Sequence, residues 1–431
     1  MASYPLEAQI HSLSLISNAA FDLQESSYDQ LQTVTTTIVT NCLADLIIQG
    51  CIGDWTIVWG PKVFTNNQTA AKVVADNTMM LVYNQSSNQF VVGIAGTNAV
   101  SMYGWFQEDF GVNTLVEWSK IVNKNINIPV VFVPVIAGGT YLGLQNLLAM
   151  EVSGVTMLSA LNTYVQENKI TGATVNVAGH SLGGALTPVM AMYMQDTQAT
   201  WNTVSGSITT IAAWPTAGPT PGNVDFATYV AKHMGANYVS RYNPIDVVPQ
   251  AWMYSSMENI PGIYPQIQAP EPQAPYYTTM GLLTLSANLR AINTSDGIRT
   301  DYQQIQPWNQ LTGCQFDTNT DNTAKIEANV LNVYATGNLA PYKPYFKAFY
   351  EFICQLGYQH TTAYNDPLGI TAVAAEMKIV KQNATNETDD VRRVNNISAA
   401  LSKYYGMSNI NVASLAAAQT QTASQEAEAV A

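Results

Sequence analysis

Apolar positions along the chain change their spacing from one segment to the next, and each spacing predicts a different element. Residues 8–50 carry apolar side chains at roughly helical spacing and predict two helices. Residues 78–95 hold two apolar, strand-like runs around a polar turn, which is typical of a hairpin. Residues 155–168 return to a helical pattern. The first part of the chain therefore mixes helices and strands.

The stretch 175–188, VNVAGHSLGGALTP, lies where a strand pattern changes to a helix pattern. Residues 174–178 are mostly apolar and β-favouring and predict a short buried strand. Residues 185–194 are rich in helix formers, with Pro188 expected in the first turn, where a missing N–H is tolerated. Residues 207–213 and 237–242 predict two more strands. Strands alternating with helices predict an α/β fold: a mostly parallel central sheet with helices on both faces.

An uncharged run from residue 126 to residue 150 is long enough to raise the question of a membrane span. Pro129, Pro134, Gly138 and Gly139 interrupt it. A strand, a loop and a helix explain this pattern better, so we expect no transmembrane span.

Composition narrows the classes of partner. Hydrophobic residues make up 47% of the 431 residues, enough for a sizeable core, while charged residues make up only 11%. The net charge of −13 argues against nucleic acid and against anionic membranes as main partners. The N-terminal MASYPLEAQI lacks the basic start and apolar run of a secretory signal, so we expect no signal peptide in this sequence.

Cysteine usage leaves the redox state open. The chain has four cysteines, which could form two disulfides or remain thiols: Cys42, Cys51, Cys314 and Cys354. No C-x-x-C pair occurs, so we expect neither a metal site nor a redox site, and no cofactor. The sparse charge favours an extracellular location over a cytoplasmic one, which stays the alternative.

Ser181 stands among glycines, and that setting has two interpretations. Gly179, Gly183 and Gly184 could form an ordinary turn with the serine as its polar tip. Alternatively they form a nucleophile elbow, a strained strand-to-helix turn in which small residues let the backbone pass. The strand predicted before Ser181 and the helix predicted after it favour the elbow, with Gly179, His180, Gly183 and Gly184 as its support.

A serine hydroxyl needs a base to remove its proton, and in α/β-hydrolases the acid and then the base follow the serine in the chain. Of the four histidines, His11 precedes the elbow and His180 adjoins the serine too closely to reach its hydroxyl. His233 has no separate strand between itself and Asp225, its nearest candidate acid. His360 remains, in a loop expected just after an aromatic helix that Gly357 would cap. Its alternative interpretation is a surface loop histidine.

Seven aspartates precede His360 and follow the elbow: Asp196, Asp225, Asp246, Asp296, Asp301, Asp317 and Asp321. Only Asp246, in NYVSRYNPIDVVP, directly follows a predicted strand. Ligands gather at the carboxyl ends of such strands, so Asp246 is the candidate acid.

A tetrahedral intermediate also needs N–H donors for its oxyanion. Leu182, directly after the serine, supplies one from its backbone. The stretch FVVGIAGTN ends a strand at Ala95 and turns at Gly96, which makes Thr97 the natural second donor, with its hydroxyl as an extra. A plain strand-ending turn is the alternative.

Several motifs occur in one order: AGT at 95–97, Trp105 and Asp109, GHSLGG at 179–184, PTPGNVDF at 219–226 and YNPIDVVP at 242–249, followed by the histidine segment. Together they resemble the class 3 (fungal-type) lipases, an α/β-hydrolase family that cleaves acylglycerols. The resemblance covers roughly residues 75–365. Ala95 and Ala217 depart from the family, which usually has Arg and often has Gly at these places, and this leaves the substrate open.

The resemblance implies Ser181, Asp246 and His360 as a catalytic triad, with Thr97 and Leu182 as the oxyanion hole. It also implies a mobile lid just after Thr97, for which Tyr103, Trp105 and Phe106 are candidates. The expected substrate is a lipid ester at a lipid–water interface, as for a triacylglycerol lipase. A carboxylesterase, a phospholipase A1 or galactolipase, and a catalytically silent lipid-binding protein of the same fold are the alternatives.

The domain organisation expected from these patterns has five parts: N-terminal helices on the core (1–50), an α/β-hydrolase core with the elbow (51–250), a cap-like insertion (251–340), the end of the core with the histidine (341–381) and a polar, partly disordered tail (382–431). The sequence leaves the oligomeric state open.

Overall fold

A computed structural model of the chain describes residues 2–98, 111–112, 114–123, 132–267, 301–318 and 343–387. The expected lid residues Tyr103, Trp105 and Phe106, most of the expected cap and nearly all of the polar tail lie outside these ranges.

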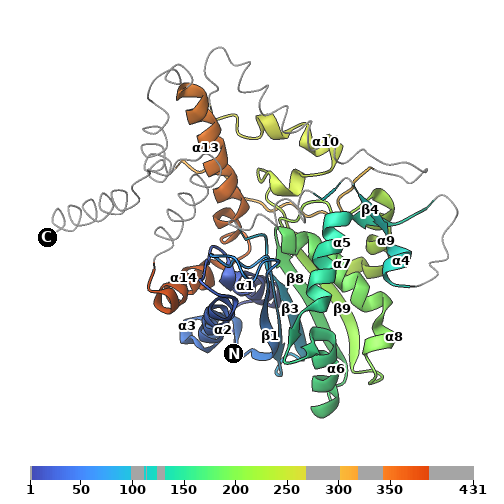
Figure 1. The fold of residues 1–431 in the computed structure, drawn as a ribbon. Helices are drawn as coiled ribbons and strands as arrows, with labels where there is room; N and C mark the ends of the chain where they lie inside the picture. The colour runs from blue at the N-terminus through green and yellow to red at the C-terminus, as the bar shows by residue number, and fades with distance from the viewer. Residues whose placement is uncertain are drawn as a thin grey trace.

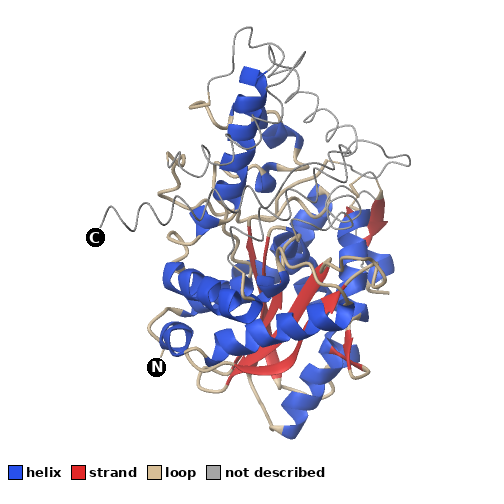
Figure 2. Ribbon diagram, turned by 60° about the vertical axis from the view of Figure 1, so that its left-hand side comes forward, coloured by secondary structure: helices blue, strands red, loops and turns tan. Residues whose placement is uncertain are grey.

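A five-stranded sheet lies at the centre, in the order β1-β2-β3-β8-β9 (Figures 1 and 2). Its strands are β1 (Thr56–Phe64), β2 (Asn77–Asn84), β3 (Gln89–Ile94), β8 (Ala173–His180) and β9 (Ile208–Thr216). β2 is antiparallel to β1 and β3, whereas β8 is parallel to β3 and β9. Four strands therefore run in one direction and β2 alone runs in the other, which confirms the predicted α/β class with a mostly parallel sheet.

Helices cover both faces of the sheet, as Figure 1 shows. One face is covered by α5 (Gly138–Ala149), α6 (Met157–Glu167), α7 (Leu182–Asp196) and α9 (Val224–Met234), the other by α1 (Leu6–Ser17), α2 (Tyr28–Ala44), α3 (Leu46–Ile52) and α14 (Thr371–Thr385). Residues alternate along the strands: in β2, Met79 and Leu81 join the first core, while Met80 and Val82 join the second. Because both faces are covered, every residue of β2 is buried.

The remaining elements are short or lie at the carboxyl edge of the sheet. They are β4 (Leu115–Glu117), α4 (Trp118–Ile121), β5 (Val135–Ala137), β6 (Glu151–Val152), β7 (Val155–Thr156), α8 (Gln198–Trp201), α10 (Tyr254–Met257) and α13 (Lys343–His360), with 3-10 turns at Asn18–Ala20 (η1), Gly235–Asn237 (η3), Val248–Gln250 (η4), Ile260–Gly262 (η5) and Thr362–Tyr364 (η7). The hairpin predicted over residues 78–95 is present as β2 and β3.

Four details differ from the sequence predictions. The N-terminal region has three helices, because Asp45 ends α2 and its side chain caps α3 by accepting from Ile47 N–H and Ile48 N–H. Pro188 lies inside α7, beyond its first turn, where it removes a hydrogen bond to the carbonyl of Gly184. Residues 237–242 form no full strand: Tyr238 and Arg241 make isolated parallel bridges to β9.

The fourth difference concerns the histidine. Gly357 does not end the helix before it: α13 continues to His360. Gly357 has no left-handed backbone angle, which a capping glycine would need, and its carbonyl accepts from the Thr361 hydroxyl at 2.7 Å. His360 is therefore the last residue of a helix and not part of a loop.

Candidate active site

Ser181 occupies the turn between β8 and α7 in a strained conformation. Its φ is 62° and its ψ is −125°, in a region that side-chain-bearing residues rarely adopt. The surrounding glycines make this turn sterically feasible. A Cβ on Gly179 would lie 2.3 Å from the carbonyl oxygen of Gly183, and one on Gly183 would lie 2.3 Å from that of Ile94. A Cβ on Gly184 would lie 2.3 Å from the carbonyl oxygen of Thr216. The elbow thus packs backbone against backbone between β3, β9 and α7.

Three side chains from distant parts of the chain meet at this turn. His360 Nε2 lies 2.7 Å from Ser181 Oγ, and His360 Nδ1 lies 2.8 Å from Asp246 Oδ2. Since a carboxylate only accepts, Nδ1 carries the proton, which leaves the lone pair of Nε2 for the serine hydroxyl. The Asp246 side chain is fully buried and that of His360 is 13% exposed. This is the arrangement by which an imidazole can take a proton from a serine.

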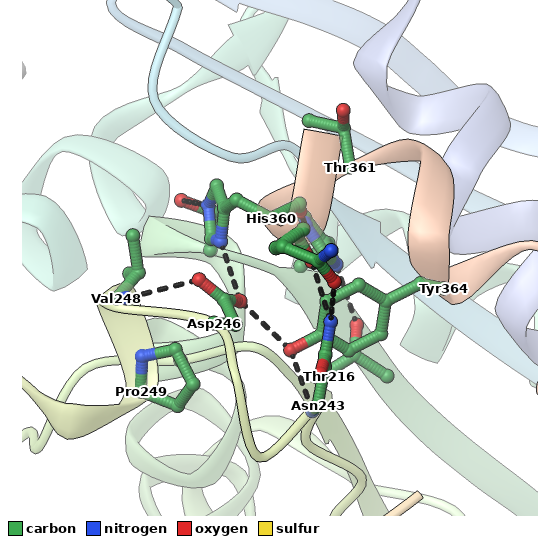
Figure 3. Close-up of polar contacts among 12 residues, drawn as sticks. Thr216, Asn243, Asp246, Val248, Pro249, His360, Thr361 and Tyr364 are labelled. Atoms are coloured by element: carbon green, nitrogen blue, oxygen red, sulfur yellow. Dashed lines mark hydrogen bonds and ion pairs between the residues drawn. The ribbon is translucent and has the colours of Figure 1, made fainter. Parts of the chain in front are cut away.

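Asp246 has two further donors (Figure 3). The hydroxyl of Tyr364 donates to Oδ2 at 2.8 Å, and Val248 N–H donates to Oδ1 at 3.0 Å. The Tyr364 hydroxyl in turn accepts from Asn243 N–H at 2.9 Å. Burial, and then the charge of Asp246, raise the pKa of Tyr364 well above its usual value, so it stays a donor. These bonds offset the loss of hydration of a buried carboxylate.

His180 fixes the backbone at the end of α13. Its Nε2 lies 2.6 Å from the carbonyl oxygen of His360, and its Nδ1 lies 3.1 Å from Thr216 Oγ1. Burial, followed by the neighbouring His360, lowers the pKa of His180 to about 3. The ring is therefore neutral at ordinary pH, with the proton on Nε2, because a carbonyl can only accept. The sequence suggested His180 as elbow support, and it also contacts the residue that carries the candidate base.

The two candidate oxyanion donors flank the serine. Leu182 is the first residue of α7, whose amino-terminal N–H groups attract negative charge. Thr97 follows β3 closely and is buried. The turn that carries it passes beside the serine, because a Cβ on Gly96 would lie 3.0 Å from Ser181 Cβ.

Residues 18–22 of the N-terminal region hold this turn. Asn18 Oδ1 accepts from Gly96 N–H at 2.8 Å, and Asn98 bonds to the carbonyl of Ala20 and to the N–H of Asp22. Lys381 of α14 in turn bonds to the Phe21 carbonyl and to Asp22 Oδ1.

The residues weighed as alternatives have other partners. His233 lies on α9, where its Nδ1 is 2.8 Å from the carbonyl of Tyr229. Asp225 accepts from Val133 N–H, and Asp196 accepts from Trp118 Nε1 and the Tyr229 hydroxyl. These bonds engage His233, Asp225 and Asp196 with partners on α9 and nearby segments, and none of the bonds is to Ser181.

Part of the aromatic stretch after residue 249 is buried. Trp252 and Tyr264 are only 6% and 4% exposed and join two small apolar clusters, whereas Tyr254 is 56% exposed. Helical or strand periodicity is missing in this proline- and tyrosine-rich stretch, so its sequence pattern does not predict which of its side chains are buried.

Among the described residues, no group of three or more His, Cys, Asp or Glu side chains could hold a metal ion.

None of the four cysteines is in a disulfide bond, and burial raises the pKa of the Cys42 thiol to about 12. In the part of the chain that the structure describes, no single helix is long and apolar enough to cross a membrane, although α2 and α3, bent at 66°, pass that test as a pair by length and composition.

Comparison with known proteins places this site in context. Residues 91–255 match the model of the class 3 lipase family. The match contains the candidate nucleophile and acid and stops before His360. No curated protein gives a significant match.

Among solved structures, M37 lipase is similar with a TM-score of 0.61 and 23% identity, over 86% of this chain and 95% of that one. Lipase II from Rhizopus niveus (TM-score 0.38, 16% identity, 58% and 77% coverage) and the Rhizomucor miehei lipase propeptide complex (0.36, 15%, 56% and 61%) are more distant. The resemblance to class 3 lipases and the α/β-hydrolase fold are confirmed, and the chain is an ester hydrolase of the lipase type.

Proposed function

We propose that the protein hydrolyses lipid esters, as a triacylglycerol lipase, through an acyl-enzyme formed on Ser181. The observation that carries the proposal is the position of His360, which lies within hydrogen-bond distance of both Ser181 Oγ and Asp246 Oδ2.

In the first step His360 Nε2 takes the hydroxyl proton while Ser181 Oγ attacks the ester carbonyl carbon. Asp246 keeps the proton on Nδ1 and stabilises the imidazolium that forms. The N–H groups of Thr97 and Leu182 donate hydrogen bonds to the negatively charged oxygen of the tetrahedral intermediate. His360 then gives its proton to the departing alcohol, and the acyl group stays on Ser181.

In the second step His360 removes a proton from water, and the resulting hydroxide attacks the acyl-enzyme. The same donors stabilise the second tetrahedral intermediate. The fatty acid leaves when Ser181 regains its proton from His360. No metal ion or cofactor enters this sequence.

The substrate class rests on the family match, and a carboxylesterase or a phospholipase A1 would use the same three side chains. Within this proposal, aromatic residues after Thr97 (Tyr103, Trp105 and Phe106) act as a lid that opens at a lipid–water interface. We expect such an enzyme to be extracellular, which agrees with the low share of charged residues in the chain, 11%.

A serine-directed phosphonate tests the chemistry. The wild-type protein should be labelled in a one-to-one ratio, and Ser181→Ala should be neither labelled nor active while retaining its thermal unfolding. If the wild-type protein resists the phosphonate and cleaves no ester, the chain is a lipid-binding protein of this fold instead.

A series of esters tests the substrate. p-Nitrophenyl esters, triglycerides and phospholipids of increasing acyl length are compared, and a short-chain triglyceride is followed through its solubility limit. A lipase with a lid gives a jump in rate at that limit. Smooth saturation together with a preference for dissolved esters identifies a carboxylesterase.

A further inference from the structure

A stretch of chain remote from the elbow holds the acid in place. Residues 301–317, here called the strap, run beside residues 240–249, which carry Asp246. Tyr242 N–H donates to the carbonyl of Asn309 at 3.0 Å, and Leu311 N–H donates to that of Tyr242 at 2.8 Å. Gln304 Nε2 donates to the carbonyl of Pro249 at 2.9 Å. The strap therefore bonds to the acid segment on both sides of Asp246.

The far end of the strap is bonded to α13, the helix that ends in His360. Gln355 Nε2 donates to the carbonyl of Asp317 at 2.6 Å, and its Oε1 accepts from Asp317 N–H at 3.2 Å. One turn later, Gln359 Nε2 donates to the carbonyl of Gln315 at 2.7 Å. Both glutamines are buried, Gln359 completely.

Gln359 also bonds directly to the acid segment. Its Oε1 accepts from Asn243 Nδ2 at 2.8 Å, and its carbonyl accepts from the same Nδ2 at 3.0 Å. Asn243 stands three residues before Asp246 and is itself fixed, because its Oδ1 accepts from Ile245 N–H at 3.0 Å. Gln359 thus joins three parts of the molecule, namely the acid segment, the strap and the residue next to the base.

On this geometry, and resting on the triad of the proposed function, we propose that Gln359 is a positioning residue that sets the separation of Asp246 and His360. The acid and the base lie 114 positions apart in the chain. The Asn243–Gln359 contact links the acid and the base through short, buried hydrogen bonds between amide groups. A buried amide that loses its partner is destabilised relative to one in water, so the pair resists separation.

The test compares two identical substitutions on one helix. Gln359→Leu removes the side-chain bonds to Asn243, Gln315 and Gln355. Gln355→Leu removes the bonds to Asp317 and the 3.3 Å acceptor of Gln359 Nε2 but keeps the Asn243–Gln359 bonds, so it controls for loss of a buried glutamine beside the strap. Activity on a soluble p-nitrophenyl ester is divided by the concentration of serine that a phosphonate titrates, which corrects for any unfolded fraction.

Gln359→Leu should lower kcat by a factor on the order of 10 to 100, the loss that a displacement of about 1 Å of a reacting group causes, with KM nearly unchanged. The acidic limb of the pH profile of kcat/KM should move to lower pH, because the imidazolium loses part of its carboxylate partner. Asp246, His180 and Tyr364 form hydrogen bonds with His360 or with its carboxylate partner, and Tyr264 and Cys314 interact electrostatically with Asp246. Neither substitution removes any of these groups. Gln355→Leu should keep kcat within about twofold and leave the limb in place.

Equal kcat values and equal pH profiles for the two variants would overturn the inference. If Gln359→Leu titrates too little serine to measure, Asn243→Asp takes its place, because it retains the acceptor for Ile245 N–H and loses the donor to Gln359. A wild-type protein that neither hydrolyses esters nor reacts with the phosphonate would refute the proposed function itself, a different result from equal variants of an active enzyme.

Discussion

The serine and the histidine of the site are held by different physical means. Ser181 sits in a turn where glycine backbones touch, so steric exclusion fixes its position: a single added Cβ at Gly179 or Gly183 would overlap a carbonyl group. His360 ends a helix whose last turn is held by hydrogen bonds from His180, Asn243 and Gln359. We therefore expect the elbow to tolerate almost no change in shape, and the histidine side to tolerate a change in shape better than the loss of a polar partner.

The largest expected effect removes the base itself. His360→Ala should lower kcat by a factor on the order of 10⁶, matching Ser181→Ala, because members of a triad act as a unit. The ester assay measures it, at a protein concentration taken from absorbance and with thermal unfolding as the check on folding. His233→Ala, on the exposed side of α9, serves as the control and should keep full activity. A His360→Ala variant with more than a tenth of wild-type activity would return His233 to consideration.

The steric side is tested by adding one methyl group. Gly183→Ala should destabilise the fold by about 3 kcal/mol and cost on the order of 10²-fold in kcat, because the new Cβ pushes the elbow away from β3. Gly357→Ala is the matched control on the histidine side: within 4 Å, a Cβ there would meet no atom of the described residues apart from its own helix backbone and chain neighbours. It should leave kcat unchanged and stabilise α13 slightly, by up to about 1 kcal/mol. Thermal unfolding and kcat are compared for both, and equal effects would remove the distinction.

The polar side is tested by removing one hydroxyl. Tyr364→Phe deletes a donor to Asp246 and the acceptor for Asn243 N–H, so kcat should fall about 10-fold, as expected for one hydrogen bond to a charged group. Tyr302→Phe removes a buried hydroxyl that donates to the Val112 carbonyl at 2.8 Å and not to Asp246. If both variants lower only the unfolding temperature and leave kcat unchanged, the Tyr364 hydroxyl has no part in orienting the carboxylate.

The smallest effect concerns pH. Because the pKa of His180 is lowered to about 3, the unfolded chain binds a proton at this residue below its ordinary pKa of about 6.5 while the folded chain does not. Stability from this residue is thus present above that pH and is lost as pH falls toward 3. His180→Gln should show a smaller drop in unfolding temperature between pH 7 and pH 4 than the wild-type protein. An identical drop in both would mean that His180 does not couple folding to protons.

These two kinds of constraint also explain what the sequence could predict. The elbow is local: strand, serine, glycines and helix follow one another within residues 174–196, and their pattern predicts the turn. Asp246 could be predicted from the sequence too, because it follows an apolar segment that bridges to β9, although that segment forms no full strand.

The polar bonds around His360 are not local. The pattern of α13 predicts a helix but gives no sign that Gln359 contacts Asn243, since amide side chains on a helix usually face water. For the same reason Gly357 suggested a cap, whereas contacts from other parts of the chain continue the helix to His360. A signal for Tyr364 was present, because it lies four residues after the histidine, within reach of the same carboxylate.

Residues 18–22 anchor the oxyanion turn, and Lys381 anchors those residues in turn. This arrangement has a consequence for the design of truncated forms of the protein. The family match begins at residue 91 and ends at residue 255, which invites expression of that segment as a minimal enzyme. Such a fragment would lack the Asn18 acceptor of Gly96 N–H and the helix that fixes Asp22. The working unit therefore includes residues 18–22 and Lys381. During synthesis the site can form only after the ribosome has completed both segments.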